Sequence, residues 1–520
     1  MKKILFYPSL AVLMALKFFP FGFRYFRYLD DYNIYGILYH RIRNGENPAS
    51  LFTFYGLNTF RPYGGALNAF VMAPLWEHLE WALLVIILLH LAALPLIEYV
   101  FNYCKLPWGK AASVVFGLYP LLTESVYWVN PGSSLVLSVF LLALSAYALC
   151  VYFESGVHGT RVCYLLLALV AGVLSLGFYE QTVSFGAALY FLIILRAVRR
   201  PGANRPGYLW FLWPFVYIGA IGLYYAMFIS GGRMAGNASL TTRPFAQIIQ
   251  TLWAMARLIA PKQLYNLYAL AKYEMPRILT QAQLYIVFAV GLLFSCLLSV
   301  SLRESGGGNE TESPSGARKA INPLYITLCL SFLLLAAFGP FFILQTSYLN
   351  MRNLLYCVPV FAVIAQVCWD ALIKKIPAKK RVLTCASAAV IFMFFLFNIC
   401  GVSAVRENYK TDLIIAEQVL GHTRAGAYDR VWLFGAKQQY APHGGANLES
   451  STFSDWALTG LVNVLNYEQG FDRYLTEDGY YFNPVAEAYN SVEAGENDLP
   501  LYIEGATPPT VSVIPRTASR

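Results

Sequence analysis

The chain has 520 residues, of which 58% are hydrophobic and only 13% are charged. A soluble domain carries roughly 25% charged residues, so this chain has about half the charge needed to cover a water-facing surface. The composition therefore excludes a string of soluble domains. It indicates a protein whose main solvent is the lipid bilayer.

The net charge of +9 is divided unevenly along the chain. Residues 1–402 hold 30 Lys and Arg against 14 Asp and Glu, whereas residues 403–520 hold 8 against 15. We predict a basic transmembrane body over 1–402 and a water-soluble C-terminal domain over 403–520. Basic runs interleaved with aromatic residues, which a nucleic-acid binder needs, are missing from the sequence, so we expect no nucleic-acid partner.

Apolar segments predict an all-α polytopic membrane protein with about eleven transmembrane helices. The N-terminus, MKKILFYPSLAVLMALKFF, is basic and then apolar with no small-residue cleavage site, which predicts an uncleaved first span. Further apolar stretches of ~17–23 residues, the length that crosses ~30 Å of hydrocarbon, centre near residues 91, 117, 143, 170, 188, 218, 292, 333, 362 and 391. The stretch near residue 117 is the weakest, because it is short and ends at Pro120.

Loop charge predicts the orientation of these spans. With the N-terminus inside, the inner loops carry 17 Lys and Arg in 57 residues, against 12 in 132 residues for the outer loops. This difference follows the positive-inside rule. We therefore predict a multi-pass cell-membrane protein with a cytoplasmic N-terminus and an extracytoplasmic C-terminus.

Two outer loops are long, 24–78 and 230–282. Within the second, apolar residues recur every three to four positions over 243–277 with Arg257 and Lys262 between them, which is typical of a helix lying in the membrane interface. We expect this segment, with Trp253 and Arg257, to guide an anionic lipid phosphate; the alternative is a lid packed on the spans. The sequence shows no inverted repeat, which weakens the case for a secondary transporter.

The tail predicts a small α/β or irregular domain. The segment TDLIIAEQVLGH has helical periodicity, YDRVWLFGAK is a strand candidate, and the last segment, ATPPTVSVIPRTASR, is expected to be extended.

An adjacent acidic pair, Asp30 and Asp31, follows the first predicted span. Charged groups so close to hydrocarbon are costly unless they have a partner or a task. One interpretation is ion pairing with Arg24, Arg27 or Arg41 that shapes the loop. The other is a carboxylate that takes a proton from an acceptor hydroxyl, with its neighbour orienting it or binding a cation.

Three later motifs also fall at predicted outer ends of spans, in PLLTESVYWVNPGSS, LSLGFYEQTVSF and QTSYLNMRNLLYCVP. Glu124, Glu180 and Arg352 are therefore expected to face the same outer vestibule as Asp30. Arg352 is the preferred cation for a leaving phosphate, and Arg61 is the second. The alternatives are that the glutamates pair with outer arginines and that the arginines anchor helix ends at the headgroups.

At these residues the sequence resembles the GT-C superfamily of membrane glycosyltransferases, and within it the protein O-mannosyltransferases. Asp30-Asp31 with YNIYGIL resembles their first-loop acidic pair. Pro120, Glu124, Trp128 and Gly132 resemble a second motif, and the segment Leu174–Glu180 loosely resembles a Leu-Ser-Lys-Glu motif. Arg352, Leu355, Tyr356 and Pro359 resemble a fourth. The Phe-Tyr-Glu-Gln stretch and the Arg-Pro-Tyr-Gly-Gly loop are similar to bacterial O-antigen glucosyltransferases. In two respects the chain departs from the pattern: Tyr179 replaces the lysine before the glutamate, and the tail has no tetratricopeptide repeat.

The resemblance, which covers roughly residues 1–400, implies an inverting glycosyltransferase. Such an enzyme moves a sugar from a polyprenyl-phosphate carrier to a hydroxyl of a glycan, lipid or protein acceptor outside the cytoplasm. It implies a first-loop carboxylate as the base, for which we choose Asp30, with Asp31 as runner-up or helper. We expect Arg352, Arg61, Glu124 and Glu180 at the substrates, together with Arg257 of the amphipathic segment. We expect no certain cofactor, and a divalent cation is an open alternative. The competing hypotheses are a transporter or flippase of a glycolipid or polyprenyl carrier, and an O-antigen polymerase or ligase.

Overall fold

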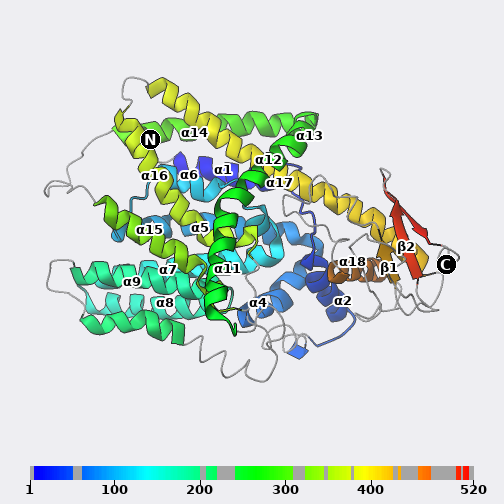
Figure 1. The fold of residues 1–520 in the computed structure, drawn as a ribbon, viewed down its shortest axis with the longest axis horizontal. Helices are drawn as coiled ribbons and strands as arrows, with labels where there is room; N and C mark the ends of the chain where they lie inside the picture. Colours follow the sequence, from blue (N-terminus) through cyan, green and yellow to red (C-terminus); the bar gives the residue numbers. More distant parts are fainter. Residues whose placement is uncertain are drawn as a thin grey trace.

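The computed structural model describes residues 5–47, 49–50, 61–199, 207–219, 241–307, 322–344, 349–375, 380–424, 431–434, 455–469, 499–504 and 508–514. Within these ranges the chain is a bundle of helices with a small sheet beyond one end (Figure 1). The α-helices are α1 (Phe6–Phe18), α2 (Ile37–Arg43), α4 (Pro62–Leu67), α5 (Leu79–Tyr103), α6 (Lys110–Leu118), α7 (Val129–Glu154), α8 (His158–Leu176), α9 (Gln181–Arg199), α11 (Pro244–Arg257), α12 (Gln263–Ala269), α13 (Met275–Leu279), α14 (Tyr285–Gly307), α15 (Pro323–Ala337), α16 (Val358–Lys375), α17 (Lys380–Thr423) and α18 (Asp455–Glu468).

Short segments of other helical types connect the α-helices. The π-helical segments are η1 (Asp31–Gly36), η3 (Asn68–Met72), η5 (Thr123–Tyr127), η7 (Leu258–Lys262) and η8 (Leu270–Glu274). The 3₁₀ segments are η4 (Ala73–His78), η6 (Tyr208–Leu212), η9 (Ala282–Leu284), η10 (Gly339–Phe342) and η11 (Met351–Tyr356). Two of the π-helical segments, η1 and η5, carry candidate site residues, and π-helical turns are frequent at functional sites.

Among the described residues, six helices are long and apolar enough to cross a membrane. They are Tyr63–Tyr103, Val129–Glu154, His158–Leu176, Gln181–Arg199, Ala282–Arg303 and Arg381–Thr423, and three shorter apolar helices cover Phe6–Phe18, Tyr208–Gly219 and Pro323–Ala337. The chain is thus a membrane-embedded helical protein. Each predicted span centre lies in a helix, but the count of about eleven spans is not confirmed. The helix near residue 117, α6, has nine residues and rises only about 14 Å.

Contacts between distant segments show which loops share an end of the bundle. The Tyr325 hydroxyl donates to the carbonyl of Cys104 (2.8 Å), and Lys110 Nζ donates to the carbonyl of Ser301 (3.0 Å). The 104–110 loop therefore lies beside the last turns of α14 and the first turns of α15. This proximity agrees with the prediction that these loops share one face. Which face is cytoplasmic stays a prediction.

Helix α17 joins the membrane body to the tail. Its 44 residues rise about 66 Å, which is more than twice the ~30 Å thickness of a hydrocarbon core. Figure 1 shows α17 continuing from the bundle toward the sheet. The predicted boundary at residue 402 therefore falls inside a continuous helix, so the start of the tail is a rigid extension of the body.

The tail has α/β structure in its described parts. Strands β1 (Val431–Phe434), β2 (Leu499–Glu504) and β3 (Thr510–Val513) form one sheet in the order β1-β2-β3. β1 pairs with β2 in parallel and β2 with β3 antiparallel, and α18 lies in the connection between β1 and β2. The expected strand in YDRVWLFGAK is confirmed as β1, and the final segment is extended at β3, within its described residues 508–514.

Helix α18 packs on the first loop of the membrane body. Tyr467 stacks on His40 with ring centroids 5.0 Å apart, and Glu468 lies 3.7 Å from Arg27. At Gly460 a Cβ atom would come within 2.7 Å of the backbone of Asn33, so the two segments approach closely only because this residue is glycine. The tail therefore holds the loop that carries the acidic pair.

Candidate active site

The acidic pair follows a strained point in the first loop. Leu29 has φ of 45°, in the left-handed region that bulky residues rarely adopt, and its side chain is buried. Asp30 comes next, partly exposed, and Asp31 begins η1. Backbone strain of this kind persists only where the surrounding contacts fix it. The loop thus presents Asp30 and Asp31 in different directions.

Asp31 is bound into the protein. Its side chain is fully buried, and Oδ2 accepts hydrogen bonds from the Tyr25 hydroxyl (2.5 Å) and the Tyr28 N–H (2.8 Å). The Tyr25 oxygen in turn accepts from the N–H of Val129, at the start of α7 (3.1 Å). Asp31 therefore ties the first loop to the motif that carries Glu124. Here the loop-shaping interpretation of the pair fits, although the partners are tyrosines and backbone rather than arginines.

Burial raises the pKa of Asp31 to about 7. The hydrogen bonds from Tyr25 and Tyr28 oppose this shift, and the negative charge of Asp30 adds to it. A carboxyl group in such a site costs less free energy when it is protonated.

Arg61 and Glu180 form a bidentate ion pair. Arg61 Nε and Nη2 donate to the two carboxylate oxygens of Glu180 at 2.9 and 2.8 Å, and the guanidinium lies over the Tyr179 ring, 4.0 Å from its centroid. Burial alone would raise the pKa of Glu180, but the charge and hydrogen bonds of Arg61 outweigh it, so this pKa is lowered. Glu180 is therefore paired with an arginine, which is one of the two alternatives given above for the glutamates.

The turn between α8 and α9 positions this ion pair. Tyr63 N–H and Gly64 N–H both donate to the carbonyl of Gly177, at 3.2 and 3.4 Å. A Cβ atom at residue 177 would lie 2.0 Å from the ring of Tyr63, so only glycine leaves room for it. These contacts bring Arg61, which directly precedes α4, beside Glu180.

Arg352 lies in a short 3₁₀ helix with a reciprocal cap. Asn350 and Asn353 each bond the other's backbone through their side chains at the start of η11. The Arg352 guanidinium lies 5.8 Å from the Trp128 ring centroid. Within the described residues it makes no hydrogen bond or ion pair, which distinguishes it from Arg61.

The charges around Arg352 show which residues are its neighbours. Burial would lower the pKa of Arg352, but Tyr179, Glu124 and Asp30 are close enough to offset this, and the pKa is raised although Arg61 opposes it. Burial raises the pKa of Tyr179, and the charges of Arg61, Glu180, Arg352 and Glu124 also act on it. Asp30, Glu124, Glu180 and Arg352, which were predicted to face one vestibule, thus form one cluster of charges with Arg61.

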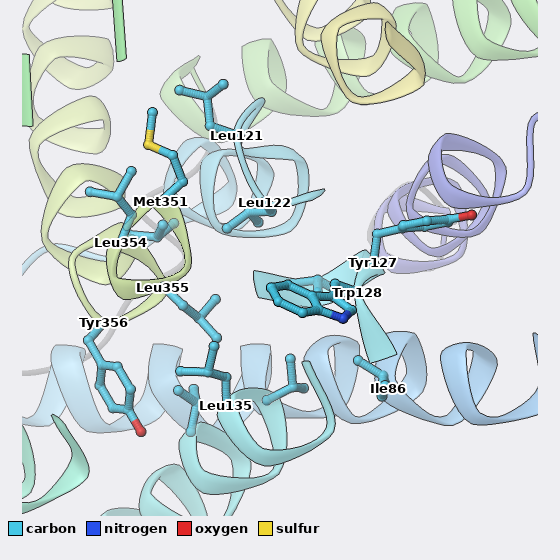
Figure 2. Close-up of a cluster of buried hydrophobic side chains, with 14 of the residues drawn as sticks. Ile86, Leu121, Leu122, Tyr127, Trp128, Leu135, Met351, Leu354, Leu355 and Tyr356 are labelled. Carbon is cyan, nitrogen blue, oxygen red and sulfur yellow. The ribbon is translucent and has the colours of Figure 1, made fainter. Parts of the chain in front are cut away.

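An apolar cluster sets the relative position of Glu124 and Arg352. Figure 2 shows Leu121 and Leu122, which precede η5, facing Met351 and Leu354 of η11. Leu355 points toward Leu135 of α7 in the same view. All of these side chains are buried. The segments that carry Glu124 and Arg352 are therefore held in place by one hydrophobic cluster. Trp128 lies between these segments and Ile86 of α5.

Arg257 does not join this cluster. It is exposed at the last residue of α11, and its guanidinium lies over the ring of Trp253, 5.3 Å from the centroid. Figure 1 shows α11 running across the direction of α7, α8 and α9, as expected of a helix lying on a bundle. No contact among the described residues links Arg257 to Arg352. The role predicted for Arg257 is therefore limited to guiding the lipid donor toward the site.

Sequence reasoning missed two aromatic contributors: Tyr25, which holds Asp31, and Tyr179, under Arg61. Trp128, named above as part of a motif, lies beside Arg352. Tyr179 was noticed only as a departure from a family pattern. The structure makes it a neighbour of both arginines, and its hydroxyl lies 3.4 Å from Asn353 Nδ2. Tyr25 is one of several tyrosines in RYFRYLDDY, and nothing in that run distinguishes it.

The described residues contain no group of three or more His, Cys, Asp or Glu side chains placed to hold a metal ion. Among the carboxylates of the cluster, Glu180 binds a guanidinium group, that of Arg61. The two arginines supply positive charge to the described site, and a divalent cation stays an open alternative.

Comparison with known proteins gives no relative: no protein-family model, no curated protein and no solved structure matches the chain.

Proposed function

We propose that this chain is an inverting glycosyltransferase that transfers a sugar from a polyprenyl-phosphate carrier to an acceptor hydroxyl at the outer face of the membrane. The observation that carries the proposal is Arg352, which has no hydrogen-bond or ion-pair partner among the described residues and lies near Asp30 and Glu124. A guanidinium left open beside carboxylates offers a phosphate site next to a candidate base.

The proposed reaction follows from these roles. Asp30 removes the proton from the acceptor hydroxyl, and the resulting oxygen attacks the anomeric carbon from the side opposite the phosphate. The new carbon–oxygen bond forms as the bond to the phosphate oxygen breaks, with inversion at that carbon. The polyprenyl phosphate leaves with the electron pair, and Arg352 stabilises its charge. The negative charge of Glu124 keeps Arg352 in its charged form.

Asp30 rather than Asp31 is the base in this scheme. Asp31 is fully buried and its Oδ2 is held by Tyr25 and Tyr28, so an acceptor hydroxyl has no access to it in this conformation. Asp30 is partly exposed and its charge reaches Arg352. Asp31 acts as a positioning residue for the loop that carries Asp30.

Arg61 is the second candidate cation because its guanidinium is already bonded to Glu180. Two of its donors already bind Glu180. Binding of a phosphate by these two donors would require that the ion pair first separate. We assign Arg61 to the sugar rather than to the leaving phosphate, and Glu180 to the orientation of Arg61.

The test is a purified-protein assay with a panel of polyprenyl-phosphate sugars, in which release of the free carrier is measured. Arg352→Gln should abolish release with every donor that the wild type accepts, and Arg352→Lys should restore part of it because a single charge remains. Arg303→Gln, at the last turns of α14, is the control and should leave release unchanged. Full release by Arg352→Gln would contradict the proposal.

One observation favours the transporter alternative. Lys17 is fully buried in α1, its Nζ donates to the carbonyl of Gly117 (2.8 Å), and the buried His90 of α5 is near it. Ionisable residues inside a membrane are costly and frequently mark a transport path. A flippase assay with a fluorescent polyprenyl-linked sugar in sealed vesicles distinguishes the two, because a transferase alone would not move the intact carrier across.

A further inference from the structure

A second polar site lies beside the acidic pair. A pocket of about 420 Å³ opens between the first loop, the start of α5 and the extended part of α17. It is lined by Phe23, Arg24, Tyr25, Phe26, Arg27, Trp76, Glu77, Leu79, Glu80 and Tyr409. Its volume falls within the range of small-ligand sites. None of the residues assigned to the proposed reaction lines it, although Tyr25 touches both sites through its bond to Asp31.

The lining of the pocket carries two positive and two negative groups. Arg27 lies over Trp76, 3.9 Å from the ring centroid, and donates to its carbonyl (3.1 Å). Arg24 is exposed, and its guanidinium makes no hydrogen bond or ion pair with a described residue. Glu77 and Glu80 supply the two negative charges of the lining. An anion would meet two carboxylates here and a cation two guanidinium groups, whereas a ligand with both charges is complementary to the whole lining.

The pocket adjoins a face of α5 that points away from the protein. Phe23 and Trp81 are 45% and 54% exposed, and their rings are 4.8 Å apart. Val85 and Leu88 continue the exposed apolar stripe one and two turns along α5. In a spanning helix such a stripe contacts lipid tails, and an exposed tryptophan at its end marks the interface. The pocket therefore opens at the level of lipid headgroups.

We propose that this pocket binds the headgroup of a zwitterionic phospholipid of the phosphoethanolamine type. Its phosphate lies on Arg24 and Arg27, since a guanidinium presents a fork of donors that fits phosphate oxygens. Its ammonium group, which has three N–H donors, lies on Glu77 and Glu80. The site is independent of the proposed transfer reaction and requires only that the chain is embedded in a membrane.

The test uses the purified, delipidated full chain and native mass spectrometry with phosphatidylethanolamine or phosphatidylglycerol of matched acyl chains. The wild type should bind phosphatidylethanolamine about tenfold more tightly, a difference that corresponds to ~1.4 kcal/mol. Arg24→Gln should weaken the binding of both lipids, because both carry the phosphate that this guanidinium binds. The double variant Glu77→Gln, Glu80→Gln should reverse the preference in favour of phosphatidylglycerol, because the pocket then carries only positive charge.

The control is Arg161→Gln, since Arg161 lies over the Tyr152 ring and does not line the pocket. This variant should keep the wild-type affinities and preference. Equal binding of the two lipids by the wild type would overturn the proposal, and so would wild-type affinities in Arg24→Gln or an unchanged preference in the double variant. Displacement of phosphatidylethanolamine by millimolar maltotriose would also overturn it, because that result assigns the pocket to a glycan. Thermal unfolding of each variant checks that the fold is kept.

Discussion

The two adjacent carboxylates of the first loop have different surroundings, and these decide what each can do. Asp31 is enclosed by tyrosines and backbone donors, whereas Asp30 reaches the open guanidinium of Arg352 through its charge. The left-handed conformation of Leu29 lies directly before them. A base must be reachable by the proton that it removes, so accessibility separates the roles of these two acids more sharply than their acidity does.

Asp30→Asn should lower sugar transfer by ~10²–10⁴-fold, the usual cost of removing a general base. Thermal stability and donor binding should stay normal, because Asp30 is partly exposed. Asp31→Asn should be milder. Carrier release and donor binding are the measurements. If Asp30→Asn keeps most activity while Asp31→Asn or Glu124→Gln loses it, the base is assigned wrongly. If all three variants transfer normally, the mechanism itself is wrong.

The raised pKa of Asp31 predicts a pH-dependent stability. In the unfolded chain this carboxyl titrates near ~3.9, and in the folded protein its pKa is about 7. Between these values the folded state binds the extra proton, so the free energy of unfolding should fall as pH rises from about 4 to 7. Asp31→Asn, which stays neutral, should flatten this dependence. The check is thermal unfolding across this range, with Glu46→Gln as control because the Glu46 side chain is 38% exposed and pairs with Arg41. Parallel curves for wild type and Asp31→Asn would contradict the prediction.

At the scale of elements, the turn before α9 controls the Arg61–Glu180 pair. Gly177→Ala would place a Cβ 2.0 Å from the Tyr63 ring, which must then move together with the backbone that carries Arg61. Overpacking of this kind costs about 1–3 kcal/mol. A shift of about 1 Å in a substrate-positioning group can lower the rate on the order of 10²-fold.

The matched control for this variant is Gly156→Ala, because a Cβ at residue 156 meets no atom within 4 Å. Unfolding temperature and carrier release should change for Gly177→Ala alone. Equal behaviour of the two variants would show that the turn does not position the ion pair.

The segment from α11 to α13 supports a second prediction at this scale. The exposed side chains Phe245, Ile249 and Trp253 form an apolar face, and Arg257 ends α11. Such a helix binds at the membrane interface, where basic groups attract anionic lipid. Arg257→Gln with Lys262→Gln should raise the apparent KM for the lipid donor and leave protein abundance unchanged. Arg303→Gln serves as control, and an unaltered donor dependence would remove the guiding role.

Elements were more predictable from the sequence than the site contacts. Apolar length alone placed a helix at every expected span centre, and the patterns of the tail predicted the end of α17, strand β1 and the extended segment that contains β3. Helix α18 and strand β2 were not predicted. The helix near residue 117 was expected to be short, but the unbroken α17 was not foreseen, since hydropathy does not report where a helix ends inside a packed bundle. The pairing of Glu180 with Arg61, rather than with Arg352, depends on Gly177 and Tyr63 meeting, which no local pattern encodes.

At the scale of the whole molecule, the tail and the membrane body are joined by a continuous helix, and both pack on the first loop. Helix α17 enters the tail without a break, and α18 returns to pack on η1 and α2 through Gly460 and Tyr467. The acidic pair is therefore held between the bundle and the tail. This arrangement links the position of Asp30 to the seating of α18 and gives the tail a role in shaping the site.

The packing of α14 on α17 predicts how the chain is oriented. Ser299, near the end of α14, contacts Ser387 near the start of α17, and Arg277, before α14, pairs with Glu407 far along α17 (2.7 Å). The two helices are thus antiparallel, and if both cross the bilayer, the 303–320 loop and the tail lie on opposite sides. Most of that loop lies outside the described residues, but its charge predicts a cytoplasmic location. In a cysteine-free variant, Ser519→Cys should therefore react with a membrane-impermeant maleimide on intact cells, and Glu310→Cys should react only after permeabilisation. Labelling of residue 310 but not of residue 519 on intact cells would reverse the orientation, and labelling of both would show that one of the two helices does not span the membrane.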